Sequence, residues 1–389
     1  MKDFNFVSPT RIHFGKNAMN FLSEEIKNKY KKVLLVYGQN SIKKIGVYDA
    51  VISQLSSANV EYFEISGVRP NPEISKVKEG LKLVRENNID LILAVGGGSV
   101  IDTAKSIAAS FYYNGDPFDL NLHKVKPEKA LPLGVVLTIS ASGSELSDSC
   151  VVMDDGTKVK QGFNSDVVRP AFAIMNPEYT YSVSKYQTAC GIVDIISHSL
   201  ERYFSPSENL EVSDSLALSI MKDTIEAGKV AIKDPNNYDA RAALMLLGAY
   251  SHNGLTSLGK EKQMPIHKME HALSAYDIRI AHGAGLSILI PAWMEASYKN
   301  DVDKFARFTK EIFGVEEKNK INTALKGITL LREYFQSIGM PISLKEVELS
   351  SKDIPSLVEM MFADTRMIGQ KSINPLSKED VEEMLRSIL

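Results

Sequence analysis

Apolar and polar positions follow two different periodic patterns along the chain. The change from one pattern to the other divides the chain into two halves. In the first half, short β-branched and aliphatic runs alternate with stretches of helical spacing, such as residues 42–57 and 73–86. Strands and helices that alternate in this way predict a parallel sheet with helices on both faces. The predicted strands are residues 33–37, 60–65, 91–95, 134–139 and 171–175.

The remaining segments predict an edge hairpin and a helical second half. Residues 4–14 contain a central Ser-Pro pair, which is typical of a sheet edge. After Pro177 the strand signal fades and helical spacing continues to the last residue. We expect an α/β domain over residues 1–182, an all-α domain over residues 183–389 and a ligand-binding cleft between them. Prolines should mark helix starts or ends at positions 206, 235, 265, 291, 341 and 355.

Composition limits the kind of protein and its partners. A chain of 389 residues exceeds one typical core, and its 44% hydrophobic and 24% charged residues are typical of a globular protein. The net charge of -3, with acids and bases interspersed, predicts no nucleic-acid partner. Cys150 and Cys190 have no CxxC spacing, which favours a reducing compartment. No run approaches the ~18 apolar residues of a membrane span, so we expect a cytoplasmic protein without membrane contact.

A glycine-rich loop follows the third predicted strand. Residues 91–106 read LILAVGGGSVIDTAKS, which predicts a buried strand, a glycine turn and a helix that starts near Ser99. Glycines allow the backbone to approach a pyrophosphate, and the helix N-terminus attracts its charge. The phosphate should lie on Gly97, Gly98 and Ser99, although a tight turn without a ligand has the same pattern. The loop is neither a GxGxxG fingerprint nor a Walker sequence, so we do not expect an ATPase.

Two other turns and one acid belong to the same predicted edge of the sheet. The turn at residues 38–41 contains no acidic side chain and precedes Lys43 and Lys44. Because an acid near the adenosine ribose favours NAD, this turn predicts a preference for NADP(H). The turn at residues 138–144 offers hydroxyl groups, or is an ordinary Ser/Thr-rich loop. Asp102 lies in the first helical turn, where it is either functional or a simple partner of the helix dipole.

Histidines and one aspartate predict a metal site in the second half. Asp194 and His198 are spaced i, i+4 on a largely apolar helix, so they share a face, and a buried Asp needs a partner. A hydrogen-bonded core pair is the alternative. His267 and His271 also share a face, and spacing leaves open which one is a ligand; His282 precedes the next apolar helix. Oxygen and imidazole ligands without thiolate suit Fe(II), Zn(II), Mn(II) or Co(II). A phosphate loop and a metal set in one chain predict hydride chemistry.

At these residues the sequence resembles the iron-containing (group III) alcohol dehydrogenases. The similarity is strongest to the branch of NADPH-dependent butanol and broad-range aldehyde dehydrogenases, and it runs through almost the whole chain. It is carried by FVSPTRIHFGKNA, YGQNSIKKIGVYDAV, AVGGGSVIDTAKSIA, TISASGSELS, GIVDIISHSLERYF and HKMEHALSAYDIRIAHGAGLSILIPAWM.

The resemblance implies a fold and a set of site residues. The fold would be a Rossmann-like α/β domain followed by a helical domain, with cofactor and metal in the cleft. One divalent ion, Fe(II) or Zn(II), would be bound by Asp194, His198, His267 and His282. His271 would face the nicotinamide and substrate, with Asp102 near the nicotinamide end as the second catalytic candidate. Cofactor contacts would come from Gly38, Ser41, Gly97, Gly98, Ser99, Thr138 and Lys160.

We therefore expect reversible hydride transfer between NADP(H) and a small primary alcohol or aldehyde of the butanol or butanal type. His271 is the candidate proton relay, since imidazole titrates near neutral pH. The sequence also allows two alternatives. One is a lyase of the dehydroquinate-synthase type, and the other is a non-catalytic nucleotide-binding protein with a structural metal. The predicted edge hairpin could pair with a second copy, which favours a homodimer.

Overall fold

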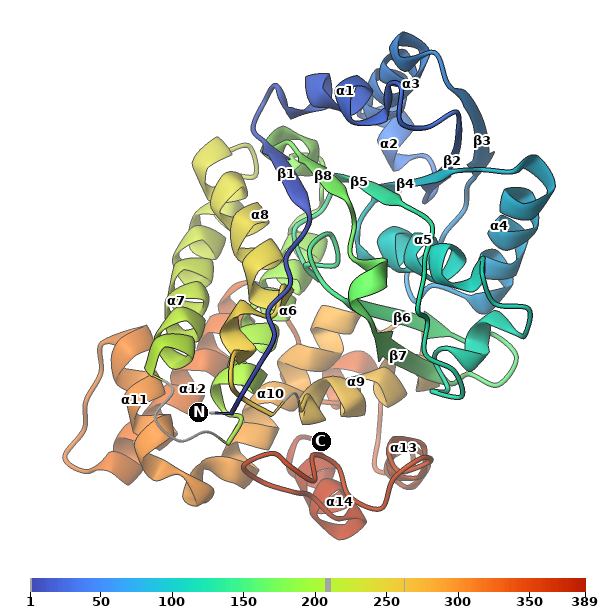
Figure 1. Ribbon diagram of the computed structural model, residues 1–389. Coiled ribbons are helices and arrows are strands. Elements are labelled where there is room, and N and C mark those ends of the chain that lie inside the picture. The colour runs from blue at the N-terminus through green and yellow to red at the C-terminus, as the bar shows by residue number, and fades with distance from the viewer. Residues whose placement is uncertain (1, 207–210, 262) are drawn as a thin grey trace. The chain divides into compact units, whose positions relative to one another are not determined.

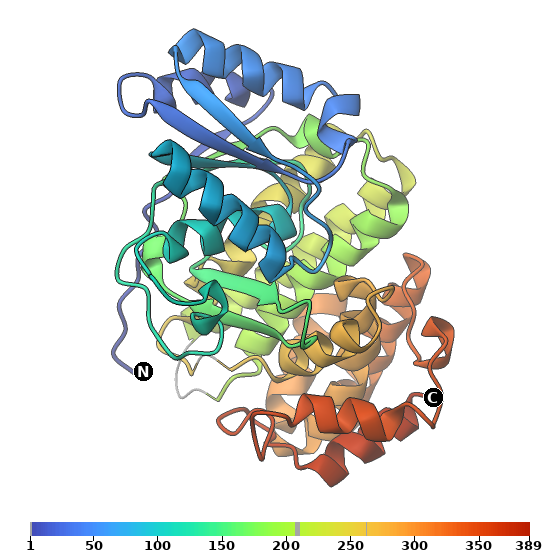
Figure 2. The ribbon, with the colours of Figure 1, turned by 90° about the vertical axis from the view of Figure 1, so that its right-hand side faces the viewer.

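The structure is a computed structural model that describes residues 2–206, 211–261 and 263–389. The chain divides into two compact units, which are coloured by residue number in Figure 1 and Figure 2. The sheet unit comprises Val7–Val183 and Asp234–Ala249. The helical unit comprises Met1–Phe6, Ser184–Lys233 and Tyr250–Leu389.

The sheet unit is built on a six-stranded parallel sheet with strand order β1-β8-β5-β4-β2-β3. All five strands predicted from the sequence are present, with ends that differ by up to two residues. The order places β4, which leads into the glycine loop, in the middle of the sheet (Figure 1). The strands are β1 (Arg11–Phe14), β2 (Lys32–Tyr37), β3 (Glu61–Ile65), β4 (Leu91–Gly96), β5 (Leu133–Leu137) and β8 (Phe172–Met175).

Helices cover both faces of this sheet. Consecutive strand residues point to opposite sides, and both sets are apolar here, so each face needs a covering layer. Leu34 and Val36 belong to one apolar cluster, whereas Val33 and Leu35 belong to the other. The predicted continuous helix over residues 42–57 is interrupted at Gly46, whose φ of 73° is left-handed. The helices of this unit are α1 (Leu22–Ile26), α2 (Ser41–Lys44), α3 (Val47–Ala58), α4 (Ile74–Asn87), α5 (Gly98–Ser110) and most of α8 (Tyr238–His252), with 3-10 turns η1 (Ala18–Phe21), η2 (Pro117–Asp119), η3 (Asp166–Val168) and η4 (Pro177–Thr180).

The structure corrects one predicted hairpin and adds another. The predicted edge hairpin at residues 4–14 is wrong, because only β1 forms there and it pairs in parallel with β8. Pro9 precedes this strand and has no N–H to donate to a second strand. A hairpin that the sequence analysis missed joins β6 (Ser149–Met153) and β7 (Lys160–Asn164) in antiparallel fashion. Its second strand, KQGFN, is largely polar and half-buried, so it lacks the apolar alternation that signals a strand.

The helical unit is organised around α6 (Lys185–Tyr203), which packs against α7 and α10. Pro265 begins α9 and Pro355 lies in the first turn of α13, as expected. Pro291 instead lies inside α10, which is buried along most of its length, so packing outweighs the lost backbone hydrogen bond. The other helices are α7 (Glu211–Lys233), α9 (Pro265–Tyr276), α10 (His282–Ser297), α11 (Val302–Phe313), α12 (Lys320–Ser337), α13 (Ile354–Met361) and α14 (Lys378–Ser387), with 3-10 turns η5 (Leu255–Ser257), η6 (Tyr298–Asn300) and η7 (Lys345–Val347).

Among the described residues, no helix has the length and apolar character that crossing a lipid bilayer requires.

Candidate active site

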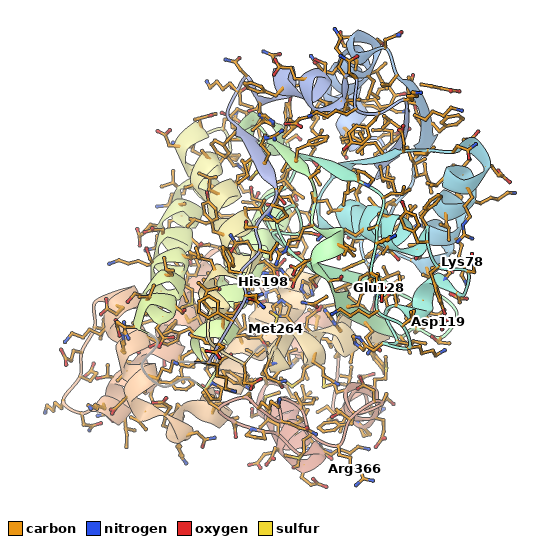
Figure 3. All side chains as sticks on the ribbon, viewed as in Figure 1. Lys78, Asp119, Glu128, His198, Met264 and Arg366 are labelled. Atoms are coloured by element: carbon orange, nitrogen blue, oxygen red, sulfur yellow. The ribbon has the colours of Figure 1, made fainter. Side chains whose placement is uncertain are left out.

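Helix α6 presents three acid and imidazole side chains along one face. Asp194 and His198 are one turn apart, and Glu201 follows at i+7, so all three point the same way. Asp194 and His198 are buried, and Figure 3 labels His198 among the helices. Ser184 caps the start of this helix, and its side chain accepts a hydrogen bond from the backbone N–H of Gln187. The sequence places this polar face in an apolar helix, so its groups must find partners inside the protein.

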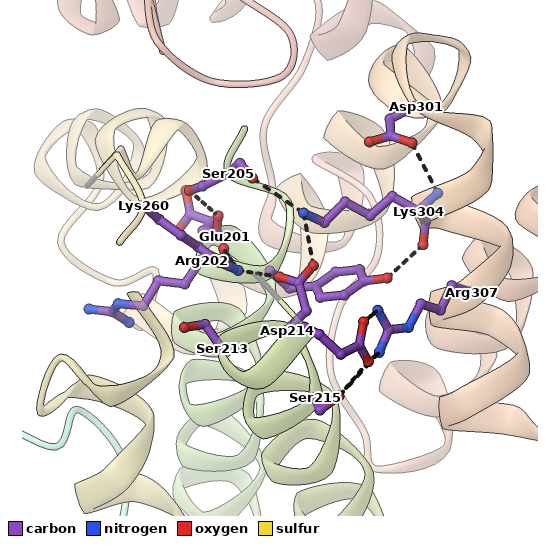
Figure 4. Close-up of polar contacts among 12 residues, drawn as sticks. Glu201, Arg202, Ser205, Ser213, Asp214, Ser215, Lys260, Asp301, Lys304 and Arg307 are labelled. Carbon is purple, nitrogen blue, oxygen red and sulfur yellow. Dashed lines mark hydrogen bonds and ion pairs between the residues drawn. The ribbon is translucent and has the colours of Figure 1, made fainter. Parts of the chain in front are cut away.

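The end of α6 is tied to the segment that leads into α9. The buried Lys260 Nζ donates to the backbone carbonyl of Arg202 at 2.9 Å and also pairs with Asp214. Lys304 pairs with the other oxygen of Asp214 at 3.3 Å, as Figure 4 shows. Burial lowers the pKa of Lys260 to about 8, although Asp214 opposes that shift. These contacts hold the last turn of α6 against Lys260.

Helices α9 and α10 bring the remaining histidines to Asp194. His267 lies in the first turn of α9, and His282 is the first residue of α10. The Asp194 Oδ1 atom lies 3.5 Å from Nδ1 of His198 and 3.6 Å from Nε2 of both His267 and His282. The side-chain atoms of Asp194, His267 and His282 form a group that could hold a metal ion. Three imidazole nitrogens therefore surround one carboxylate oxygen at nearly equal distances.

These atoms lack ordinary partners. Asp194 Oδ1, His198 Nδ1 and His267 Nε2 are buried and have no hydrogen-bond partner within the described part of the chain. Ligands at metal bond lengths of about 2.0–2.2 Å in a tetrahedron stand about 3.4 Å apart. The observed separations of 3.5 and 3.6 Å match that spacing. A divalent metal ion held by Asp194, His267 and His282 would satisfy Asp194 Oδ1 and His267 Nε2; His198 lies 3.5 Å from the same oxygen but outside that group of three.

Two buried glutamates, which the sequence analysis missed, are hydrogen-bonded to His267 and His282 on the side of each ring away from Asp194. The Nδ1 atom of His267 is hydrogen-bonded to Glu201, and that of His282 to Glu270. Exposure is 2% for Glu201 and 0% for Glu270, and with Asp194 they make three buried carboxylates. Buried charges require counter-charges, which a divalent cation supplies. Glu201 at i+7 from Asp194 and Glu270 at i+3 from His267 were the available signals in the sequence.

A fourth imidazole contacts the group. The ring of His252, at the end of α8, lies 3.9 Å from that of His198, and this residue was not anticipated. Burial, with the charges of His252 and His267, holds the pKa of His198 well below its usual value. Burial alone would lower the pKa of His267, but Glu201 and Asp194 raise it to about 9.

The structure separates the two histidines that spacing could not. His267 lies against Asp194, whereas the ring of His271 lies 6.4 Å from that of His267 and 5.9 Å from that of His282. His271 is half-buried. This position places it beside the predicted ligands.

In the sheet unit, the predicted phosphate loop contacts the turn at residues 138–144. Gly97 precedes α5, and Gly98 begins it. A Cβ on Gly97 would lie 2.2 Å from Ile139, and one on Gly98 would lie 2.4 Å from Ser142. The backbone N–H of Thr138 donates to Gly96 at 3.1 Å. Both glycines are needed for this close approach, so two of the predicted cofactor turns lie side by side.

Asp102 and Lys160 have structural partners in the same unit. One Asp102 oxygen accepts from the Ser144 hydroxyl at 2.6 Å, and the other accepts from the backbone N–H of Val151 at 3.0 Å. Burial raises the pKa of Asp102, while the charge of Lys105 opposes that shift most strongly. Lys160 begins β7 and contributes to the same electrostatic environment. A catalytic role of Asp102 stays a prediction.

In the turn after β2, the charge of Lys43 is partly engaged by neighbouring aromatic rings. Gly38 follows β2, and Ser41 begins α2 at an exposed position. The Lys43 ammonium lies over the rings of Tyr37 and Tyr48, at 5.4 and 4.7 Å from their centroids. Both tyrosine hydroxyls donate to Glu64, on β3. Lys43 is therefore partly engaged with this pair of rings.

Comparison with known proteins decides the family. Residues 9–177 match the family described as iron-containing alcohol dehydrogenase, and residues 188–389 match its C-terminal family, described as Fe-containing alcohol dehydrogenase family, C-terminal. The chain belongs to the iron-containing alcohol dehydrogenase family. It is therefore an alcohol oxidoreductase that uses an NAD(P) cofactor and a metal ion, and the lyase and non-catalytic alternatives are set aside.

Two relatives in the iron-containing alcohol dehydrogenase family are informative about activity. The NADH-dependent butanol dehydrogenase A of Clostridium acetobutylicum is 42% identical, over 99% of each chain. The NADPH-dependent aldehyde reductase YqhD of Escherichia coli is 35% identical, over 93% of each chain. The crystal structure of NADH-dependent butanol dehydrogenase A from Thermotoga maritima superposes with a TM-score of 0.95 at 38% identity, covering 100% of this chain and 99% of that one. The fold class predicted from the sequence is confirmed.

Proposed function

We propose that this chain reduces small aldehydes, and oxidises the matching primary alcohols, with NADP(H) and one divalent ion, Fe(II) or Zn(II). Butanal and butanol represent the substrate class, in line with the butanol dehydrogenases that the chain resembles. The observation that carries the proposal is the placement of three imidazole nitrogens 3.5 to 3.6 Å from one buried oxygen of Asp194.

The residues of the chain have distinct parts in this proposal. Asp194, His198, His267 and His282 would hold the ion. Bound groups supply a hydride from the nicotinamide and Lewis-acid polarisation of the carbonyl oxygen by the metal. His271, half-buried beside His282, would deliver the proton to the oxygen of the reduced substrate, because imidazole exchanges protons near neutral pH.

The cofactor residues act through the sheet unit. Gly97, Gly98 and Ser99 would bind the pyrophosphate at the start of α5, where backbone N–H groups and the helix dipole favour an anion. The remaining proposed cofactor contacts are Gly38, Ser41, Thr138 and Lys160.

The proposed preference for NADP(H) rests on the turn after β2. Residues 38–41 carry no acid that would repel a 2′-phosphate, and the nearby Glu64 is hydrogen-bonded to two tyrosine hydroxyls. Relatives include both NADH-dependent and NADPH-dependent proteins, so the preference is specific to this turn and not to the family.

A second copy of the chain is the proposed macromolecular partner. β1 is an edge strand with β8 on one side, and Phe14 at its end is 37% exposed. An edge strand has backbone groups available for pairing, so a homodimer through β1 is the proposed assembly. Cys150 and Cys190 are buried free thiols, which fits a reducing compartment, and we propose the cytoplasm.

The test is NADPH consumption with butanal before chelation, after chelation and after return of Fe(II) or Zn(II). Loss of several kcal/mol of Lewis-acid stabilisation should slow turnover at least about 100-fold, and metal should restore it. NADPH binding, measured by fluorescence, should be unchanged by chelation and serves as the control. Equal turnover in metal-free protein would contradict the proposed metal role.

A further inference from the structure

Two glutamates outside the ligand set control how the histidines face the proposed metal. We propose that Glu201 and Glu270 are positioning residues, which fix the tautomer and ring orientation of His267 and His282 and thereby set metal affinity. The inference rests on the proposed metal site. It assigns unequal importance to the two glutamates, and that inequality makes it testable.

Glu201 joins α6 to the start of α9 through both of its oxygens. Oε1 accepts the backbone N–H groups of Ile266 at 2.6 Å and His267 at 3.3 Å. Oε2 is hydrogen-bonded to Nδ1 of the His267 ring. The first N–H groups of a helix have no partner within it, and Pro265 offers none. Glu201 therefore satisfies the start of α9, interacts favourably with its dipole and holds the His267 ring.

Glu270 holds His282 in a simpler way. It lies one turn after His267 on α9, and its Oε2 is hydrogen-bonded to Nδ1 of His282 at the start of α10. Gly285 makes this contact possible, because a Cβ there would lie 2.9 Å from Cγ and 3.1 Å from Oε1 of Glu270. Glu270 is fully buried, so its carboxylate is shielded from water.

Both contacts have the same consequence for the ring. A carboxylate at Nδ1 keeps the proton on that nitrogen, so the lone pair of Nε2 is available on the other side. Nε2 of both His267 and His282 lies 3.6 Å from Asp194 Oδ1. His198 differs, because its Nδ1 faces Asp194 and its ring packs on that of His252. Two of the three rings are thus fixed by carboxylates and the third by ring packing.

The number of acceptors used by each glutamate predicts different effects of glutamine. Glu201 accepts through both oxygens, and glutamine has only one carbonyl oxygen, so E201Q must lose either the helix start or the His267 ring. Glu270 is hydrogen-bonded to Nδ1 of His282 through Oε2, so the carbonyl oxygen of E270Q can replace that acceptor. Alanine at position 270 offers no acceptor.

The experiment measures Zn(II) affinity of the full chain by competition with a chromophoric chelator. Loss of a group that orients a ligand typically costs 10- to 100-fold in metal affinity, and we expect about that loss for E201Q and E270A. E270Q should lose less than about 10-fold and bind more tightly than E201Q. The visible spectrum of the Co(II)-loaded protein should change in E201Q and E270A and stay close to wild type in E270Q.

The matched control is E25Q. Glu25 is also a buried glutamate that bonds a histidine, His13 at 2.9 Å, but it belongs to the sheet unit. E25Q should lower stability while Zn(II) affinity stays within twofold of wild type. Circular dichroism of each metal-free variant separates misfolding from metal loss, and E270A carries the test if E201Q does not fold.

Three outcomes would overturn the proposal. Wild-type affinity in both E201Q and E270A would show that the glutamates do not position the rings. An equal loss in E25Q would show that the effect is general destabilisation. A wild-type chain that binds neither Zn(II) nor Co(II), yet is correctly folded, would remove the metal site itself and the positioning role with it.

Discussion

Asp194 Oδ1 is the atom around which the candidate site is arranged. It is buried without a hydrogen-bond partner among the described residues, and three imidazole nitrogens surround it. A bare carboxylate at such a position costs several kcal/mol unless a cation compensates it. Charge also matters in the proposed cofactor loops. A bound dinucleotide is negatively charged, so one acidic side chain in such a loop would change cofactor affinity.

Gly38 provides the residue-scale prediction about cofactor choice. A Cβ at this position would meet Val68 O at 3.5 Å and Val100 Cγ2 at 4.0 Å, which are ordinary contacts, so a side chain fits. Gly38→Asp would place a carboxylate where the 2′-phosphate of NADPH is proposed to bind. We expect KM for NADPH to rise at least about tenfold, and KM for NADH to change much less.

Steady-state kinetics with both cofactors measures this effect, and Gly38→Asn is the control of equal size without charge. If Gly38→Asp and Gly38→Asn raised KM for NADPH and KM for NADH equally, the turn would not distinguish a 2′-phosphate from a 2′-hydroxyl.

At the scale of secondary-structure elements, one carboxylate links β1 to α1. Glu25, on α1, accepts from Arg11 at 2.5 Å and Lys29 at 3.0 Å, and it bonds His13 at 2.9 Å. This cluster joins an edge strand to the first helix, so its charge state affects how well that end of the sheet unit is held. A buried glutamate also joins two elements at α9, where Glu201 from α6 accepts the backbone N–H groups of Ile266 and His267.

Glu25 gives the pH-dependent prediction. Burial alone would raise its pKa, but hydrogen bonds from Arg11, His13 and Lys29 lower it to about 2 from an ordinary 4.5. Because the folded pKa is depressed, the stabilisation is complete above about pH 4.5 and is lost as pH falls toward 2. Glu25→Gln should therefore destabilise the fold by roughly 1 to 2 kcal/mol at pH 7, allowing for solvent screening, and by much less near pH 2.5.

Urea unfolding of wild type and variant at each pH measures the difference, and other titrating groups cancel in it. The exposed neighbour Glu24 supplies the control Glu24→Gln, which should have little effect at either pH. A difference that is the same at both values would mean that Glu25 acts through packing and not through charge.

Local patterns predicted the elements well but the contacts poorly. Helical spacing identified α6 and α9 and the faces that carry Asp194 and His267, because i, i+4 neighbours share a face in any helix. It could not choose between His267 and His271, since the choice depends on where α6 and α10 lie. Glu201 and His252 were missed for the same reason, because their roles are set by residues far away in the sequence.

The hairpin errors have a different cause. Residues 4–14 have the composition of an edge, but their partner β8 is more than 150 residues away, and parallel pairing has no local signal. β7 is half-buried and largely polar, so its pattern is that of a loop. The Lys43 contact with Tyr37 and Tyr48 is likewise invisible in the sequence, and it weakens the argument from basic residues in the turn after β2.

At the scale of the whole molecule, the two kinds of chemistry belong to different units. All four proposed metal ligands lie in the helical unit, and the proposed cofactor residues lie in the sheet unit. A ligand stabilises the part of a protein that it binds, by an amount that grows with its concentration over Kd. Metal and nucleotide should therefore protect different segments.

Hydrogen exchange and thermal unfolding show which unit each ligand stabilises. Zn(II) at about 100 times its Kd contributes about 2.7 kcal/mol, which should raise the unfolding midpoint of the helical unit by roughly 5 to 10 °C. Peptides from α6, α9 and α10 should exchange more slowly with Zn(II), and peptides from β4 and α5 should do so with NADPH. His267→Ala should abolish the response to Zn(II) and leave the response to NADPH nearly intact, because its side chain contacts Glu201 and Asp194 within the helical unit. If Zn(II) protected the peptides of both units equally, the units would unfold as one, and the separation of metal and nucleotide roles would have to be abandoned.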